Sequence, residues 1–143
     1  MAVAAIDTLV PCGAPDDSDQ WHEAALPILR GIDDGALPKV VVLDFVLVET
    51  MNGLTRRLSH AAAVDFLERL EVNPRFSVKR VTSGGFSTRK ELFRERPRLS
   101  LVDSLLVGYM RTRGIEFLYS FDDDFDGLAG VTRLGTAENP FDT

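Results

Sequence analysis

Short apolar runs alternate along this chain with segments of helical periodicity, and this alternation constrains the fold more than any other feature. The runs have the length of buried strands and lie at residues 3–6, 39–43, 75–81, 115–120 and 131–134. The segments between them are long enough to cross over between parallel strands. The pattern therefore predicts an α/β sandwich with a mainly parallel sheet, in which ligands bind beyond the carboxyl ends of the strands.

The helical segments are defined by apolar residues that recur every three or four positions. We expect helices at about residues 20–30, 45–58, 61–70, 87–96 and 101–113. Ser59 and Ser100 are suited to cap two of these helices, and Asp44 a third, because their side chains accept hydrogen bonds from backbone amides. Pro27 predicts a kink in the first helix or a later start.

Turn-forming residues predict where these elements are interrupted. Loops are expected at residues 11–19 and 31–38, and the Gly84-Gly85 pair is expected to break the chain before the helix that follows it. A continuous helix over residues 9–14 is improbable because of three nearby residues, which are Pro11, Gly13 and Pro15.

Composition bounds the class of protein. The chain has 143 residues, of which 45% are hydrophobic, and this predicts one globular domain over residues 1–143. Cys12 is the only cysteine, which excludes an intramolecular disulfide. The longest apolar stretch, residues 40–48, is too short to span a membrane, and the N-terminus lacks the basic region of a signal peptide. We therefore expect a reduced, cytoplasmic protein that does not bind a membrane.

Charge is distributed unevenly around a net value of −6. Residues 61–114 hold 11 basic and 6 acidic side chains, whereas residues 1–60 hold 4 and 9, and residues 115–143 hold 1 and 7. A basic flank beside a carboxylate cluster would suit a phosphate-backbone ligand that approaches bound cations. The alternative is a solvated surface whose charge varies along the chain without a ligand, and the charge count alone favours this alternative.

Four acids occupy positions that this architecture brings to one edge of the sheet. Asp7 and Asp122 follow predicted strands, whereas Glu49 and Asp103 lie in the first turns of predicted helices. Each has an ordinary interpretation by itself, and Asp103 fits a capping box with Ser100. Together, their oxygens are the hard ligands that Mg²⁺ or Mn²⁺ prefers, and a shared cation would offset their mutual repulsion.

Other chemistries have less support. His22 and His60 are far apart and do not have the spacing of zinc ligands. The chain has no G-x-S-x-G elbow, and the segment that begins at Gly84 lacks the order of a phosphate-binding loop. Asp44 lacks the paired acids that a phospho-acceptor site would need after the first strand.

Five blocks of the chain carry a family likeness. They are Ile6-Asp7-Thr8, Trp21-His22-Glu23-Ala24-Ala25, Asp44-Phe-Val-Leu-Val-Glu49-Thr-Met-Asn52, Leu99-Ser-Leu-Val-Asp103-Ser-Leu-Leu and Ser120-Phe-Asp122-Asp-Asp124-Phe125. In this order and spacing, the blocks resemble the PIN domain family, and within it the VapC-like ribonuclease toxins of type II toxin–antitoxin pairs. The likeness covers about residues 3–134.

The resemblance implies a three-layer α/β/α sandwich and a metal-dependent endoribonuclease. It makes Asp7, Glu49, Asp103 and Asp122 a catalytic quartet that holds Mg²⁺ or Mn²⁺, with Asp7 and Asp103 as the main direct ligands. Further residues that would support the site are Thr8, Ser120, Asp124 and Asp126. The family also implies an RNA substrate, a small antitoxin protein as partner, and a homodimer.

These observations lead to one hypothesis and two alternatives. In the hypothesis, the quartet holds one or two cations that lower the pKa of an attacking water and stabilise charge on an RNA phosphodiester. Basic side chains of the middle segment, Arg89 among them, would bind flanking phosphates, or else they are solvated helix faces. The alternatives are a PIN-fold nuclease of RNA processing or repair, and a PIN-fold interaction module without catalysis.

Overall fold

Five parallel strands form one sheet in this computed structural model, which describes residues 2–8, 10, 13 and 20–142, with the backbone alone for residues 83–88. The strands are β1 (Val3–Ile6), β2 (Lys39–Leu43), β3 (Phe76–Lys79), β4 (Phe117–Tyr119) and β5 (Thr132–Leu134). Every neighbouring pair in the order β3-β2-β1-β4-β5 is parallel. Each strand lies within a run that the sequence predicted, and the prediction of a mainly parallel sheet is confirmed.

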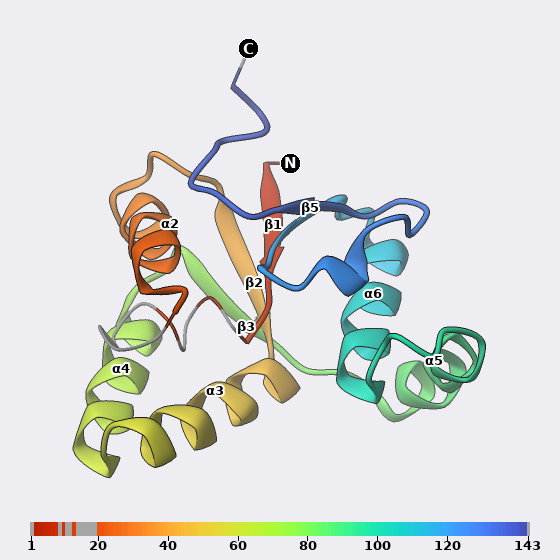
Figure 1. Ribbon diagram of the computed structural model, residues 1–143, viewed down its shortest axis with the longest axis horizontal. Helices are drawn as coiled ribbons and strands as arrows, with labels where there is room; N and C mark the ends of the chain where they lie inside the picture. The colour runs from red at the N-terminus through yellow and green to blue at the C-terminus, as the bar shows by residue number, and fades with distance from the viewer. Residues whose placement is uncertain (1, 9, 11–12, 14–19, 143) are drawn as a thin grey trace.

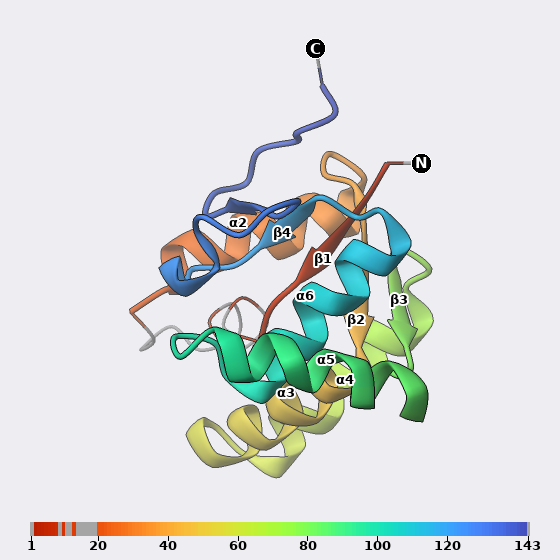
Figure 2. The same cartoon turned by 90° about the vertical axis from the view of Figure 1, so that its right-hand side faces the viewer.

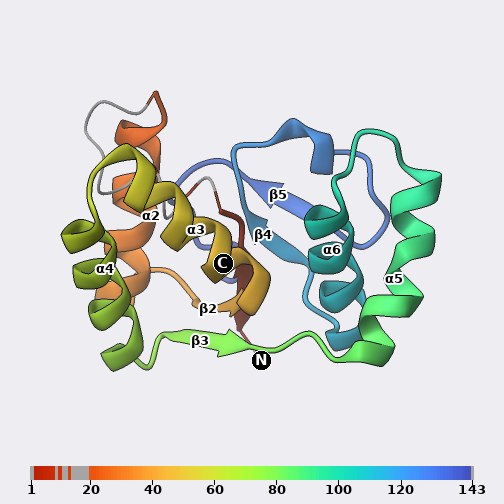
Figure 3. The same cartoon turned by 90° about the horizontal axis from the view of Figure 1, so that it is seen from below.

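Helices cover both faces of the sheet. They are α2 (His22–Asp34), α3 (Asp44–Arg57), α4 (His60–Val72), α5 (Ser83–Glu95) and α6 (Leu101–Arg113). Figure 1 shows α2 and α4 on one side of the strands and α5 and α6 on the other; Figure 2 looks onto the α5–α6 side, and Figure 3 shows the division from below. This confirms the predicted three-layer sandwich. None of the helices in the described ranges is long and apolar enough to cross a membrane.

The inner strands β1 and β2 are almost continuously apolar because both faces of the sheet are covered. Ala4, Ala5 and Ile6 of β1 have no exposed surface, and in β2 Val40 is equally buried. A sheet with one solvated face would instead alternate apolar and polar residues. The continuous runs seen in the sequence therefore follow from the layered architecture.

The order of the strands creates a switch point beside β1. The chain places β2 and β3 on one side of β1, and β4 and β5 on the other. In an open α/β sheet, such a switch point leaves a crevice at the carboxyl ends of the two strands that flank it. These strands are β1 and β4, which pair through Ile6 and Tyr119. Residues that follow Ile6 and Tyr119 therefore lie at the edge where ligands bind in this class of fold.

Helix α2 is longer than the sequence predicted. The loop expected at residues 31–38 was wrong for its first part, because α2 continues to Asp34 and also runs through Pro27 without a later start. A Cβ atom at Gly31 would lie 2.7 Å from Cγ of Leu37, so this glycine allows close packing and does not mark a turn. The helix ends at Gly35, whose φ of 91° is left-handed.

Two predictions about helix starts were also wrong. Helix α5 begins at Ser83, so the Gly84-Gly85 pair lies inside it; the packing of α5 against α6 outweighs the low helix propensity of glycine. Asp44 is the first residue of α3 and Leu43 is its cap. Asp44 Oδ1 accepts hydrogen bonds from the amides of Phe45 and Val81, and it therefore ties the start of α3 to the loop after β3.

Most of the proline-containing segment after β1 falls outside the described residues. The predictions made for Pro11, Cys12 and Pro15 lie there. Val10 and Gly13 are described, and both are helical, so the predicted loop is wrong at Gly13.

The caps predicted at Ser59 and Ser100 are confirmed, and the first of them can be tested by substitution. Ser59 Oγ accepts a hydrogen bond from the amide of Ala62 at 3.0 Å. We expect Ser59→Ala to lower the free energy of unfolding by about 1 kcal/mol in urea denaturation, and Ser59→Asp to retain it because Asp also caps well. Equal stability of the alanine variant and the wild type would contradict this role.

Candidate active site

Asp7 lies at the carboxyl end of β1, at the switch point of the sheet. Its amide donates to the carbonyl of Tyr119 at 3.0 Å, which extends the β1–β4 pairing past both strands. The residue is 6% exposed. Its Oδ1 accepts from the amide of Thr8 at 2.8 Å, and its Oδ2 accepts from Ser120 Oγ at 2.8 Å. Groups from both central strands therefore fix the orientation of this buried carboxylate.

Ser120 connects Asp7 to the turn that follows β4. The residue is fully buried, and its hydroxyl donates to Asp7 and accepts from the amide of Asp122 at 3.1 Å. Its own amide donates to the carbonyl of Leu134 at 3.1 Å, which anchors the segment to β5. A hydroxyl can donate and accept at once, so this one side chain fixes Asp122 relative to Asp7.

Glu49 reaches the same edge from α3. Thr8 Oγ1 donates to Glu49 Oε2 at 3.2 Å, which links α3 to the residue directly after Asp7. Helix α3 begins immediately after β2, and β2 is the neighbour of β1 in the sheet. The first turns of α3 therefore lie near the carboxyl end of β1, as the sequence predicted for Glu49.

Asp103 lies in the first turn of α6 and completes a capping box. Its amide donates to Ser100 Oγ at 3.0 Å, and its Oδ2 accepts from the amide of Ser100 at 3.1 Å. The capping box that the sequence predicted for Asp103 and Ser100 is therefore confirmed. The capping hydrogen bond leaves other lone pairs of this carboxylate available, since its two oxygens offer about four acceptor positions.

The charges of neighbouring carboxylates affect the protonation of Asp7 and Asp103. Burial raises the pKa of Asp7 to about 7; a hydrogen bond from Ser120 opposes this rise, and the charges of Asp103 and Asp122 add to it. Burial also raises the pKa of Asp103; hydrogen bonds with Ser100 oppose this rise, and the charges of Asp122 and Glu49 add to it. The structure therefore brings the predicted quartet together at one edge of the sheet.

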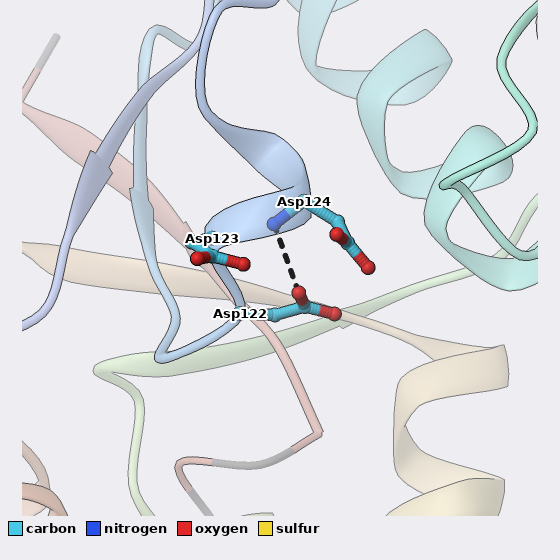
Figure 4. Close-up of side chains that lie close together, drawn as sticks. All are labelled: Asp122, Asp123 and Asp124. Atoms are coloured by element: carbon cyan, nitrogen blue, oxygen red, sulfur yellow. Dashed lines mark hydrogen bonds between the residues drawn. The ribbon is translucent and has the colours of Figure 1, made fainter.

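Asp122 also belongs to a tighter acidic group on the turn after β4. This turn contains η1 (Asp123–Phe125), and Figure 4 shows the side chains of Asp122, Asp123 and Asp124 gathered around it. One oxygen from each lies within 4.8 Å of the others. Across the part of the chain that is described, this is the only group of three or more potential metal-ligating residues that meets this spacing. The quartet is more open, with Asp122 as the residue that both groups share.

Arg98 forms ion pairs with two of the acids in this turn. Its Nε donates to Asp124 Oδ1 at 2.7 Å, and its Nη2 lies 3.3 Å from Asp123 Oδ1. Arg98 could not be predicted from the sequence, because its partners are 25 and 26 positions away and no local pattern marks such a pair. Asp124, which the sequence predicted to support the site, therefore pairs with Arg98.

Arg133 forms an ion pair with Asp126, the last acid of the turn. It donates to both carboxylate oxygens of Asp126, at 2.8 and 3.1 Å, and to the carbonyl of Ser120 at 3.3 Å. The hydrogen bonds and the positive charge lower the pKa of Asp126. Asp126, which the sequence predicted to support the site, thus binds Arg133 beside it. Asp122 instead contributes its negative charge to the surroundings of Asp7.

The donor set is suited to a hard divalent cation. A buried carboxylate surrounded by other carboxylates is unfavourable unless a positive charge compensates it. Asp7, Asp103 and Asp122 offer only oxygen ligands, the type that Mg²⁺ and Mn²⁺ prefer, and Glu49 adds a fourth carboxylate. The arrangement could therefore hold a cation next to the crevice of the sheet.

Comparison with known proteins identifies relatives of this chain. The model of the PIN domain family matches residues 6–131. Among solved structures, VapC20 of Mycobacterium tuberculosis, described as a toxin that cleaves the sarcin-ricin loop, has a TM-score of 0.75 and 26% identity, over 90% of this chain and 98% of its own. No curated protein matches this chain in sequence.

Two further solved structures show the same fold at lower identity. A toxin–antitoxin complex from Klebsiella pneumoniae has a TM-score of 0.61 and 18% identity, over 95% of this chain and 98% of its own. VapBC2 from Rickettsia felis, bound to a DNA fragment from its promoter, has a TM-score of 0.67 and 12% identity, over 92% and 97% of the two chains.

The raised pKa of Asp7 predicts a pH-dependent loss of stability in the metal-free protein. The folded pKa of about 7 exceeds the unfolded value of 3.8, so the contribution of Asp7 to stability is complete below 3.8 and is lost as the pH rises through 7. We expect Asp7→Asn to be more stable than the wild type by up to about 4 kcal/mol at about pH 8, and equally stable near pH 4. Urea denaturation in EDTA across this range measures the difference, and a difference that does not vary with pH would contradict the prediction.

Proposed function

Because this chain belongs to the PIN domain family, we propose that it is a metal-dependent ribonuclease that hydrolyses RNA phosphodiester bonds and acts as the toxin of a toxin–antitoxin pair. The family match spans residues 6–131, and the proposal treats residues 1–143 as one PIN-like domain. The similarity to VapC20, a toxin that cleaves an RNA loop, supports both the substrate class and the toxin role.

One observation carries the proposal. At the switch point of the sheet, the buried carboxylate of Asp7 lies within electrostatic reach of Asp103 and Asp122, and Thr8 links it to Glu49. Such a concentration of negative charge is costly for a domain that only binds another protein. It is useful to a nuclease, because the same carboxylates attract the cation that phosphodiester hydrolysis needs.

The residues of the site divide into ligands and supports. Asp7, Asp103 and Asp122 would hold the cation, with Glu49 as the fourth carboxylate. When bound, Mg²⁺ or Mn²⁺ supplies positive charge that lowers the pKa of the attacking water and stabilises charge on the phosphate. Ser120 holds Asp7 in its orientation through the 2.8 Å hydrogen bond. The reaction needs no side-chain nucleophile.

The proposal includes partners and a location. RNA is the substrate, and a small antitoxin protein inhibits the enzyme. A homodimer would cover part of the apolar surface that α3 and α4 leave exposed, such as Val48 and Val72 at 57% and 81% exposure. A toxin that acts on cellular RNA works in the cytoplasm, which agrees with the single cysteine of the chain.

Cleavage of RNA tests the catalytic role of the quartet. We expect Asp7→Asn and Asp103→Asn each to reduce cleavage in Mg²⁺ or Mn²⁺ by at least about 100-fold, because each removes a ligand charge. Asp65→Asn provides a matched control, since Asp65 is an exposed acid on α4 that pairs with Arg69. Circular dichroism checks that all three variants fold. Wild-type cleavage rates in both quartet variants would refute the mechanism.

Cation binding can be measured without any substrate. A ligand that binds only the folded state raises the melting temperature, and about 2.7 kcal/mol is gained at 100 times the Kd. We therefore expect millimolar Mg²⁺ or Mn²⁺ to raise the melting temperature of the wild type by several degrees, and that of Asp7→Asn much less. Sodium chloride at matched ionic strength is the control for screening. A wild-type protein that responds equally to sodium chloride and to the divalent salts would not contain the site.

A further inference from the structure

The α5–α6 side of the molecule concentrates positive charge. Residues 79–113 contain nine Lys or Arg and three Asp or Glu, although the chain as a whole has a net charge of −6. Helices α5 and α6 account for much of this stretch and pack against each other on the face that Figure 2 presents. Such a face attracts a polyanion, but net charge by itself does not define a binding site.

Two guanidinium groups on this face share one aromatic ring. The Cζ atom of Arg113, in the last turn of α6, lies 5.4 Å from the ring centroid of Tyr109. The Cζ atom of Arg89, which projects from α5, lies 5.8 Å from the same centroid. Tyr109 is only 6% exposed, so its ring is held by the core. The buried ring therefore positions one arginine from each helix.

Gly108 makes room for Arg89. A Cβ atom at this position would lie 2.4 Å from both Cγ and Cδ of Arg89. The stem of Arg89 therefore crosses directly over the backbone of α6. Its Nη2 donates to Thr112 Oγ1 at 3.4 Å, and that hydroxyl donates to the carbonyl of Gly108 at 2.9 Å. The guanidinium of Arg89 is thus held in place before any ligand binds.

Neither guanidinium has a carboxylate partner within the described part of the chain. The ion pairs found there involve Arg69, Arg94, Arg98 and Arg133. Burial lowers the pKa of Arg89; Tyr109 opposes this effect, and the nearby charge of Arg113 adds to it. Two like charges close to one ring repel each other, and an anion that binds both guanidiniums would offset this repulsion.

We propose that Arg89 and Arg113 form a binding site beside Tyr109 for a backbone phosphate of the RNA substrate, away from the bond that is cut. This proposal rests on the ribonuclease function proposed above. A guanidinium binds phosphate oxygens through two parallel hydrogen bonds, and two positioned guanidiniums can hold one phosphate from two directions. Such contacts position the RNA strand and do not read its sequence.

The place of the site in the fold fixes its role. Asp103 lies in the first turn of α6 and Arg113 in its last, so about 15 Å of helix separate them at 1.5 Å per residue. A phosphate held there belongs to a nucleotide distant from the scissile bond. The site therefore contributes to the affinity for long RNA more than to the chemical step.

Binding of RNA in EDTA tests the site independently of catalysis. The probe is a fluorescein-labelled single-stranded RNA of about 16 nucleotides, a length that spans a single-strand binding groove. We expect the double variant Arg89→Gln/Arg113→Gln to bind about tenfold more weakly than the wild type. The slope of log Kobs against log salt concentration should become shallower by about 0.7, the value for one lost phosphate contact.

A matched control separates the site from general charge. Arg94→Gln also removes one positive charge from α5, but Arg94 already pairs with Glu91. We expect Arg94→Gln to bind RNA with nearly the wild-type affinity and salt slope, and Arg113→Gln to weaken both. Equal losses in these two variants would overturn the proposed site in favour of unspecific attraction.

Gly108→Ala tests the site without a change in net charge. The added methyl group displaces the stem of Arg89, so we expect weaker RNA binding even though every arginine is retained. Thermal unfolding checks that the helix is intact, and Ala favours a helix more than Gly does. RNA binding that is unchanged in both Gly108→Ala and the double arginine variant would overturn the proposal.

The outcomes distinguish this proposal from the ribonuclease function. If the wild type cleaves RNA in Mn²⁺ but the arginine variants bind RNA normally, the phosphate site is wrong and the nuclease stands. If the wild type binds RNA through these arginines but does not cleave it, the nuclease assignment fails and the binding site stands. If the variants lose binding of poly-glutamate and keep that of RNA, the arginines bind an acidic protein, which overturns the proposal.

Discussion

The burial of one carboxylate at the end of the central strand is the constraint on which this site depends. Asp7 must follow β1 directly, because the switch point exists only beside that strand. A charged group there loses most of its hydration, and the fold replaces it with hydrogen bonds from Thr8 and Ser120. These hydrogen bonds do not compensate fully, since the pKa of Asp7 stays raised at about 7. The remaining cost is the physical reason to expect a cation.

The other members of the site come from the ends of helices that the same topology brings to this edge. Helices α3 and α6 both begin at the carboxyl side of the sheet; Asp103 lies in the first turn of α6, and Glu49 lies in the second turn of α3. A helix N-terminus carries partial positive charge, which favours an acid in that position. The capping box of Asp103 is thus not an alternative to a role in the site. It fixes the side chain at the place where that role needs it.

The sequence predicts those features that depend on local pattern. All five strands follow from apolar runs, and the positions of the four acids follow from where strands end and helices begin. Gly31 and Gly84 were misread because packing against Leu37, and of α5 against α6, involves residues that are distant in the sequence or lie on another element. Arg98 and Arg133 were missed for a similar reason, as their acidic partners meet them only in the folded chain. Local pattern thus predicts the acids better than it predicts the cations that neutralise some of them.

Helix α6 connects the two charged regions of the molecule. Its first turn places Asp103 at the negative edge of the sheet, and its last turn places Arg113 on the positive α5–α6 face. An RNA strand is repelled by carboxylates unless a cation compensates them, whereas arginines attract it at any point along its backbone. A straight helix has a fixed length, so it also fixes the distance between these opposite effects. The strand would then be held by one end of α6 while the other end contributes to the chemistry.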